Sequence, residues 1–91
     1  MDKNLAEKAL QSKGYSKVVE VTFDKGQVNS NHTHPYDADV IVLKGEMKVK
    51  VGHREHVIRA GDSFSLAAEV EHSEEVGNEG ITLLVGRSEN T

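Results

Sequence analysis

The chain has 91 residues, a net charge of −4 and no cysteine. A chain of this length forms a single domain and buries roughly 64% of its unfolded surface, which is enough for one modest core. The eleven Lys and Arg residues are spread along the sequence and form no basic patch, so we do not expect a nucleic-acid partner. The absence of cysteine excludes disulfides, and any metal ion must be held by nitrogen and oxygen ligands.

The sequence has no membrane-targeting feature. Its longest apolar run, Val40 to Leu43, is far shorter than the roughly 20 residues that a spanning helix needs. The charged N-terminus does not resemble a signal peptide, so we expect a cytoplasmic protein with no membrane partner. Because the domain is small and only 36% hydrophobic, we also expect a homodimer, paired around residues 17–24.

The N-terminal segment, 1–16, is predicted to form a short amphipathic helix. Apolar side chains recur at helical spacing between Leu5 and Leu10. Asp2 or Asn4 is available to cap the N-terminus of this helix, and Gly14 is placed to end it.

From residue 17 onward the hydrophobic period changes from 3.6 to 2, as in Val19–Phe23 and Met47–Val51. Regularly spaced glycines offer the positive φ that tight turns require. These turn candidates are Lys25-Gly26, Lys44-Gly45, Gly52-His53, Ala60-Gly61-Asp62 and Gly77-Asn78-Glu79-Gly80. Strands of about six residues at this spacing predict an all-β domain over 17–91, a small antiparallel barrel or sandwich.

Two of the five histidines have a spacing suited to metal binding. In an extended segment His32 and His34 project from the same face, so both imidazoles can converge on one ion such as Zn, Fe, Ni or Cu. The pair alone is weak evidence, because histidines in a polar loop are more often solvent-exposed, and a third ligand must come from elsewhere. His53 and His56 lie in a charged turn, and we assign them no role.

The frame around this pair resembles the first motif of the cupin superfamily. That motif has Gly, five residues, His-x-His, three or four residues, Glu, six residues and Gly. The segment from Gly26 to Gly45 matches every fixed position except the acid.

A second segment resembles the second cupin motif. Gly61-Asp62 opens it, and His72 follows at the motif's histidine position. The chain departs from the motif at Ala67 in place of proline, Glu69 in place of glycine and Val76 in place of asparagine. The resemblance covers roughly residues 17–87. It implies a small antiparallel β-barrel of the jelly-roll, double-stranded β-helix type, with three metal ligands in its mouth: His32, His34 and His72.

The position at which cupins usually carry a glutamate ligand is Ala38. Its neighbours Asp37 and Asp39 project to the opposite face of an unbroken strand. Pro35 can break the strand, because proline is usually confined to edges and bulges, and the four-residue spacing would then place Asp39 in the ligand position. The alternative for Asp39 is a solvated aspartate at the barrel rim.

Three neutral histidines on a divalent ion (Fe, Mn, Ni or Zn) leave coordination positions open for water or substrate. Such a site resembles those of thiol dioxygenases and diketone-cleaving dioxygenases, which implies an oxygen-dependent enzyme acting on a small polar organic molecule. One alternative is a non-catalytic cupin that binds a metal or small ligand, and another is a metal-free sugar-modifying cupin. Tyr36 near the histidines is either a proton donor to the site or an aromatic side chain that fills the mouth. Metal binding is expected to weaken below about pH 6.5, because ligating histidines must be neutral.

Overall fold

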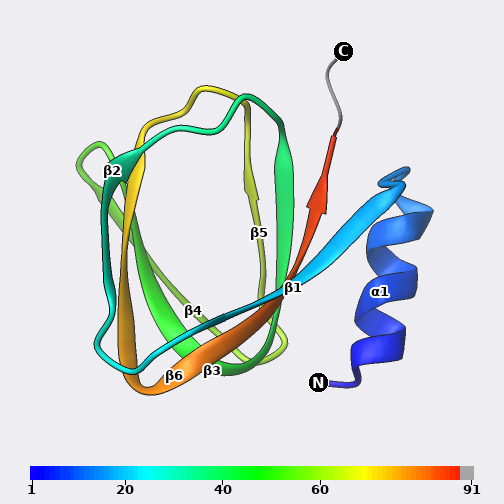
Figure 1. Ribbon diagram of the computed structural model, residues 1–91, viewed down its shortest axis with the longest axis horizontal. Helices are drawn as coiled ribbons and strands as arrows, with labels where there is room; N and C mark the ends of the chain where they lie inside the picture. Colours follow the sequence, from blue (N-terminus) through cyan, green and yellow to red (C-terminus); the bar gives the residue numbers. More distant parts are fainter. Residues whose placement is uncertain (89–91) are drawn as a thin grey trace.

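The computed structural model describes residues 1–88. One helix precedes six strands that form an antiparallel sheet wrapped into an incomplete barrel (Figure 1). In chain order the elements are α1 (Lys3–Ser12), β1 (Lys17–Phe23), β2 (Val28–His32), β3 (Ala38–Val51), β4 (Arg54–Arg59), β5 (Ser63–Leu66) and β6 (His72–Arg87).

Two long strands organise the barrel. β3 and β6 pair with each other along most of their lengths, and each also pairs with two shorter strands. The first part of β6 pairs with β2 and its second part with β1, while β3 pairs first with β5 and then with β4. Both long strands therefore belong to two layers at once, which confirms the predicted jelly-roll architecture.

Both long strands bend where glycines meet. Gly45 and Gly80 have φ values of 82° and 73°, and a Cβ on Gly45 would overlap the carbonyl oxygen of Gly80. The register of β3 against β6 shifts on both sides of Gly45. The prediction that Lys44-Gly45 and residues 77–80 are turns between short strands was therefore wrong. The positive φ is present, but it bends a continuous strand because both flanking segments keep their partners.

The predicted N-terminal helix is present, and Asp2 is its cap. The Asp2 carboxylate accepts hydrogen bonds from two backbone amides of the first turn. Ala6 and Leu10 are completely buried and pack against Ile41 and Leu84 on the outer face of the barrel wall. The wall is consequently buried on both faces here. Among residues 1–88, no helix has the length and apolar character needed to cross a membrane.

Alternate residues of the same strands face inward and form the main core. Val42, Met47 and Leu83 are at most 3% exposed and belong to one cluster inside the barrel. Inward positions nearer the mouth carry polar side chains in place of apolar ones, and there the interior is hollow.

Candidate metal centre

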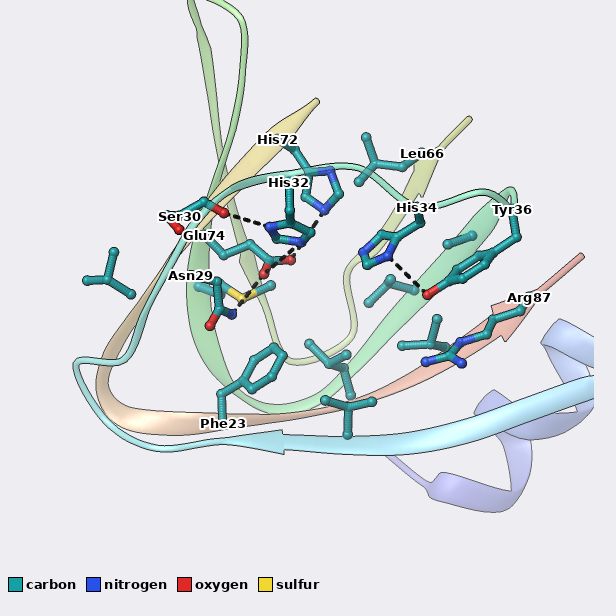
Figure 2. A pocket seen from close by; sticks show the side chains of 17 residues that line it. Phe23, Asn29, Ser30, His32, His34, Tyr36, Leu66, His72, Glu74 and Arg87 are labelled. Atoms are coloured by element: carbon teal, nitrogen blue, oxygen red, sulfur yellow. Dashed lines mark hydrogen bonds and ion pairs between the residues drawn. The ribbon is translucent and has the colours of Figure 1, made fainter. Parts of the chain in front are cut away.

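The barrel encloses a cavity of about 630 Å³ (Figure 2). Its walls combine apolar side chains from β1, β3 and β6 with a group of polar ones. In Figure 2 the histidines lie on the side of the cavity opposite Phe23. The polar lining residues are Asn29, Ser30, His32, His34, Tyr36, His72, Glu74 and Arg87.

The structure brings together the three histidines singled out in the sequence. His32 ends β2 and lies opposite His72, the first residue of β6, and His34 follows in the next loop. The ring centroids are 4.2 Å apart for His32 and His72, and one potential ligand nitrogen from each of the three rings lies within 4.8 Å of the others. The remaining histidines, His53 and His56, do not line the cavity.

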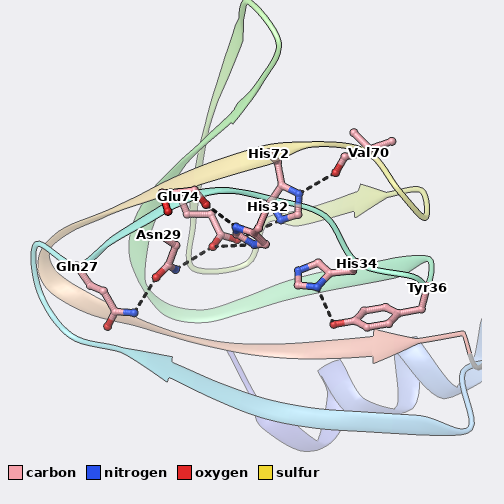
Figure 3. Close-up of polar contacts among 9 residues, drawn as sticks. Gln27, Asn29, His32, His34, Tyr36, Val70, His72 and Glu74 are labelled. Carbon is pink, nitrogen blue, oxygen red and sulfur yellow. Dashed lines mark hydrogen bonds and ion pairs between the residues drawn. The ribbon is translucent and has the colours of Figure 1, made fainter.

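Backbone carbonyls fix the orientation of two of these rings (Figure 3). His32 Nδ1 lies 2.7 Å from the carbonyl oxygen of Ser30, and His72 Nδ1 lies 3.0 Å from that of Val70. A carbonyl oxygen only accepts, so each Nδ1 carries the proton. Each Nε2 is left with a free lone pair, which is the arrangement that a ligating histidine needs.

His34 is held by Tyr36. The phenol oxygen of Tyr36 lies 3.2 Å from His34 Nδ1, and the two rings stack with centroids 5.0 Å apart. Burial lowers the pKa of His34 below its usual value of 6.5, and the positive charges of His32 and His72, when protonated, lower it further. His34 therefore favours the neutral form, which is the form that binds a metal ion. Tyr36 also lines the cavity and packs against the core, so its position fits both roles considered for it.

A carboxylate that the sequence analysis missed lies beside these rings. Glu74 Oε1 is 3.9 Å from His32 Nε2, and its Oε2 is 3.8 Å from His72 Nε2. The Glu74 side chain is 14% exposed, and Asn29 Nδ2 donates to Oε1 at 2.9 Å. Gln27 in turn donates to Asn29 at 2.9 Å. The sequence did indicate this position, because residues 72 and 74 are two apart in one strand and their side chains therefore share a face.

Asp39 does not reach the histidines. Ala38 lines the cavity, as strand parity predicts, and Asp39 faces the other way. Its carboxylate accepts a hydrogen bond from the Ser65 hydroxyl and lies 3.7 Å from Lys13 Nζ. The alternative in which a strand break places Asp39 in the ligand position is therefore wrong, because the strand keeps its register with β5 here. Asp37 accepts a hydrogen bond from a backbone amide in the loop before β6.

Comparisons with known proteins place this geometry in a family. The sequence model described as "Cupin domain" matches residues 19–85. No curated protein matches the sequence. An RmlC-like cupin from Shewanella frigidimarina is 30% identical, with a TM-score of 0.68 over 80% of this chain and 66% of that one.

Two further solved structures share the fold. The DMSP lyase DddQ from Ruegeria pomeroyi is 20% identical, with a TM-score of 0.70 over 79% of this chain and 38% of that one. The cupin domain of Cnp3 from Schizosaccharomyces pombe is 15% identical, with a TM-score of 0.73 over 80% of this chain and 55% of that one. The chain thus spans two thirds or less of these three proteins. Given the jelly-roll barrel and a family match over most of its length, the chain belongs to the cupin family.

Proposed function

We propose that this cupin binds one divalent metal ion through the Nε2 atoms of His32, His34 and His72, and that a small organic molecule occupies the cavity beside it. The observation that supports the proposal is the convergence of three nitrogen donors within 4.8 Å. The carbonyl acceptors at Nδ1 of His32 and His72 add a second argument, since they leave the Nε2 lone pairs of these two rings available. Imidazole donors suit Zn, Fe and Ni, and the ligand type alone does not select among them.

Glu74 is part of this proposal as the negative charge beside the ion. Three neutral histidines leave the two positive charges of the ion uncompensated in a largely apolar cavity. Each carboxylate oxygen of Glu74 lies within 4 Å of a histidine Nε2, and Asn29 holds the group in place. Glu74 thereby replaces, from β6, the charge that Ala38 does not provide on β3.

The protein's own contribution to chemistry is to position a ligand and exclude water. Val40, Met47 and Leu83 form part of the apolar wall, and Tyr36 presents a phenol next to His34. A bound iron ion would supply oxygen activation, whereas zinc, nickel or manganese would supply a Lewis acid. The enzymatic form of the proposal is an oxygen-dependent reaction on a small organic substrate. A binding-only cupin would use the same site without turnover.

Elemental analysis of tag-free protein, purified without chelator or added metal, tests the site. We expect near-stoichiometric metal in the wild type and its loss in His32→Ala, His34→Ala and His72→Ala. His53→Ala is the matched control, because His53 lies in the exposed turn after β3 and outside the cavity. If the wild type stays empty after reconstitution with Fe(II), Mn(II), Ni(II) and Zn(II), or if the cavity variants keep the metal, the proposed site is wrong.

Oxygen uptake separates the enzymatic form from the binding-only form. With Fe(II)-loaded protein and a panel of small organic substrates, an enzyme consumes oxygen in proportion to the substrate added. A binding module shows ligand-dependent thermal stabilisation without uptake. The His72→Ala variant serves as the blank in both measurements.

A further inference from the structure

A cationic side chain in the cavity has a buried nitrogen atom with no hydrogen-bond partner among residues 1–88. Arg87, the last residue of β6, lines the cavity, and its Nε is buried with no hydrogen-bond partner in the described part of the chain. No carboxylate of residues 1–88 forms an ion pair with it. A buried donor without a partner is destabilising, so this nitrogen calls for a ligand, an ion or a water in the place of its partner.

Arg87 is held in place by an aromatic ring. Its Cζ lies 4.9 Å from the ring centroid of Tyr36, the residue that also contacts His34 (Figure 2). A guanidinium over an aromatic face keeps its edge of N–H donors available while losing little conformational freedom. Arg87 and the histidines are therefore connected through one side chain and share one cavity.

The rest of the lining limits what Arg87 can bind. Arg87 is the only Lys or Arg among the described residues that line the cavity, and Glu74 contributes a negative charge. No helix end lines the cavity to add further anion-binding amides. A dianion such as phosphate would meet one cation and one carboxylate, whereas a single carboxylate group matches the two parallel donors of one guanidinium.

We propose that the cavity binds a small organic monocarboxylate whose carboxylate group is held by Arg87. Figure 2 shows Arg87 and Glu74 on different sides of His34, so the ligand's carboxylate lies toward Arg87 and its apolar body lies against the barrel wall. This inference names the ligand class of the proposed function and rests on it in one respect, namely that the cavity is the ligand site.

The test uses metal-free, ¹⁵N-labelled full-length protein, so that it does not depend on metal binding. Sodium benzoate and neutral benzamide, which have nearly the same shape, are titrated separately while the Nε–Hε signal of Arg87 is followed by NMR. We expect benzoate to shift this signal saturably and to bind at least about tenfold more tightly than benzamide, because charge-assisted hydrogen bonds are the stronger class.

Two variants isolate the guanidinium. Arg87→Gln should abolish the preference for benzoate over benzamide, as read from backbone amide signals of the cavity. Arg54→Gln removes the same charge from an exposed position on β4 outside the cavity, and it should keep the preference. If Arg87→Gln fails to fold, Arg87→Lys replaces it, and a charge without the planar fork should still weaken benzoate binding several-fold.

Other outcomes contradict the inference or separate it from the proposed metal site. Equal binding of benzoate and benzamide, or an equal effect of the Arg87 and Arg54 substitutions, would show that Arg87 does not recognise a carboxylate. Inorganic phosphate that binds more tightly than benzoate would refute the choice of a monocarboxylate. Arg87-dependent benzoate binding in a protein that never takes up metal would refute the proposed metal site and leave this inference standing. Metal uptake without Arg87-dependent benzoate binding would refute this inference and leave the metal site standing.

Discussion

Replacing Glu74 by glutamine removes one negative charge beside the three histidines and changes little else. Glutamine is nearly isosteric, and its carbonyl oxygen can still accept the hydrogen bond that Asn29 donates to Oε1. The variant therefore tests the charge of Glu74 separately from its packing. Loss of a group that supports metal ligands typically reduces metal affinity by about 10–100-fold.

The size of the effect can be expressed as a melting temperature. For a 91-residue chain the entropy of unfolding is about 0.19 kcal/mol per K near 60 °C. Zinc at about 100 times its Kd stabilises the wild type by about 2.7 kcal/mol, which raises Tm by about 14 °C. A 30-fold loss of affinity leaves about 0.9 kcal/mol at the same zinc concentration, or about 5 °C.

The assay is thermal unfolding with and without zinc, supported by a competition titration with a chelator. Glu75→Gln is the matched control, because it removes the same charge from the next, exposed position of the same strand. We expect the zinc-induced shift to be reduced in Glu74→Gln and unchanged in Glu75→Gln. A Glu74→Gln shift within about 2 °C of the wild-type value would refute the assignment of Glu74 to the ion.

Four further predictions can be tested. Gly45→Ala places a Cβ against the Gly80 carbonyl at positive φ and should lower the free energy of unfolding, measured with urea, by at least about 3 kcal/mol. Gly52 also has positive φ but nothing within 4 Å of the position that a Cβ would take, so Gly52→Ala should cost only about 1–2 kcal/mol. Equal costs would contradict the close contact between Gly45 and Gly80. Glu69 adopts φ 66° where the second cupin motif has glycine, so Glu69→Gly should raise Tm by about 3–5 °C, and a lower Tm would be evidence against backbone strain. In metal-free protein the pKa of His34 is lower than in the unfolded chain, so the unfolded chain binds the proton more readily. The free energy of unfolding, measured between about pH 7.5 and 5.5, should therefore fall as the pH drops below about 6.5, and it should fall less steeply in His34→Gln. Parallel curves for the two proteins would contradict this cause. The homodimer expected from the small size of the chain predicts twice the monomer mass by light scattering at micromolar concentration, and a monomer mass would overturn it.

Local patterns were sufficient for much of the fold. The helical spacing that ends at Leu10 and the alternation in Met47–Val51 both depend on neighbouring residues, and both elements are present. The two histidine-bearing motifs also predicted that His32 and His72 would meet, although 40 residues separate them.

The predictions from the sequence failed where contacts between distant segments determine the structure. Lys44-Gly45 has the composition of a turn, and only pairing with β6 on both sides keeps it inside a strand. Glu74 was not predicted because the first motif places the carboxylate at Ala38, whereas the structure has one two residues after His72 on the same strand. Arg87 was missed because it lies outside both motifs, and the register between β6 and β1 determines where it ends.

The pairing of β2 has a consequence for the stability of the histidine cluster. β2 pairs only with β6 among the described strands, its register is interrupted between Asn29 and His32, and three of its five residues are exposed. Such an edge opens locally at a much lower free energy than the whole barrel, so its amides should exchange with solvent well before those of β3. Because β2 carries His32, each local opening withdraws one of the three imidazoles from the cluster. Opening at this edge is therefore the local motion that would disturb the histidine cluster directly.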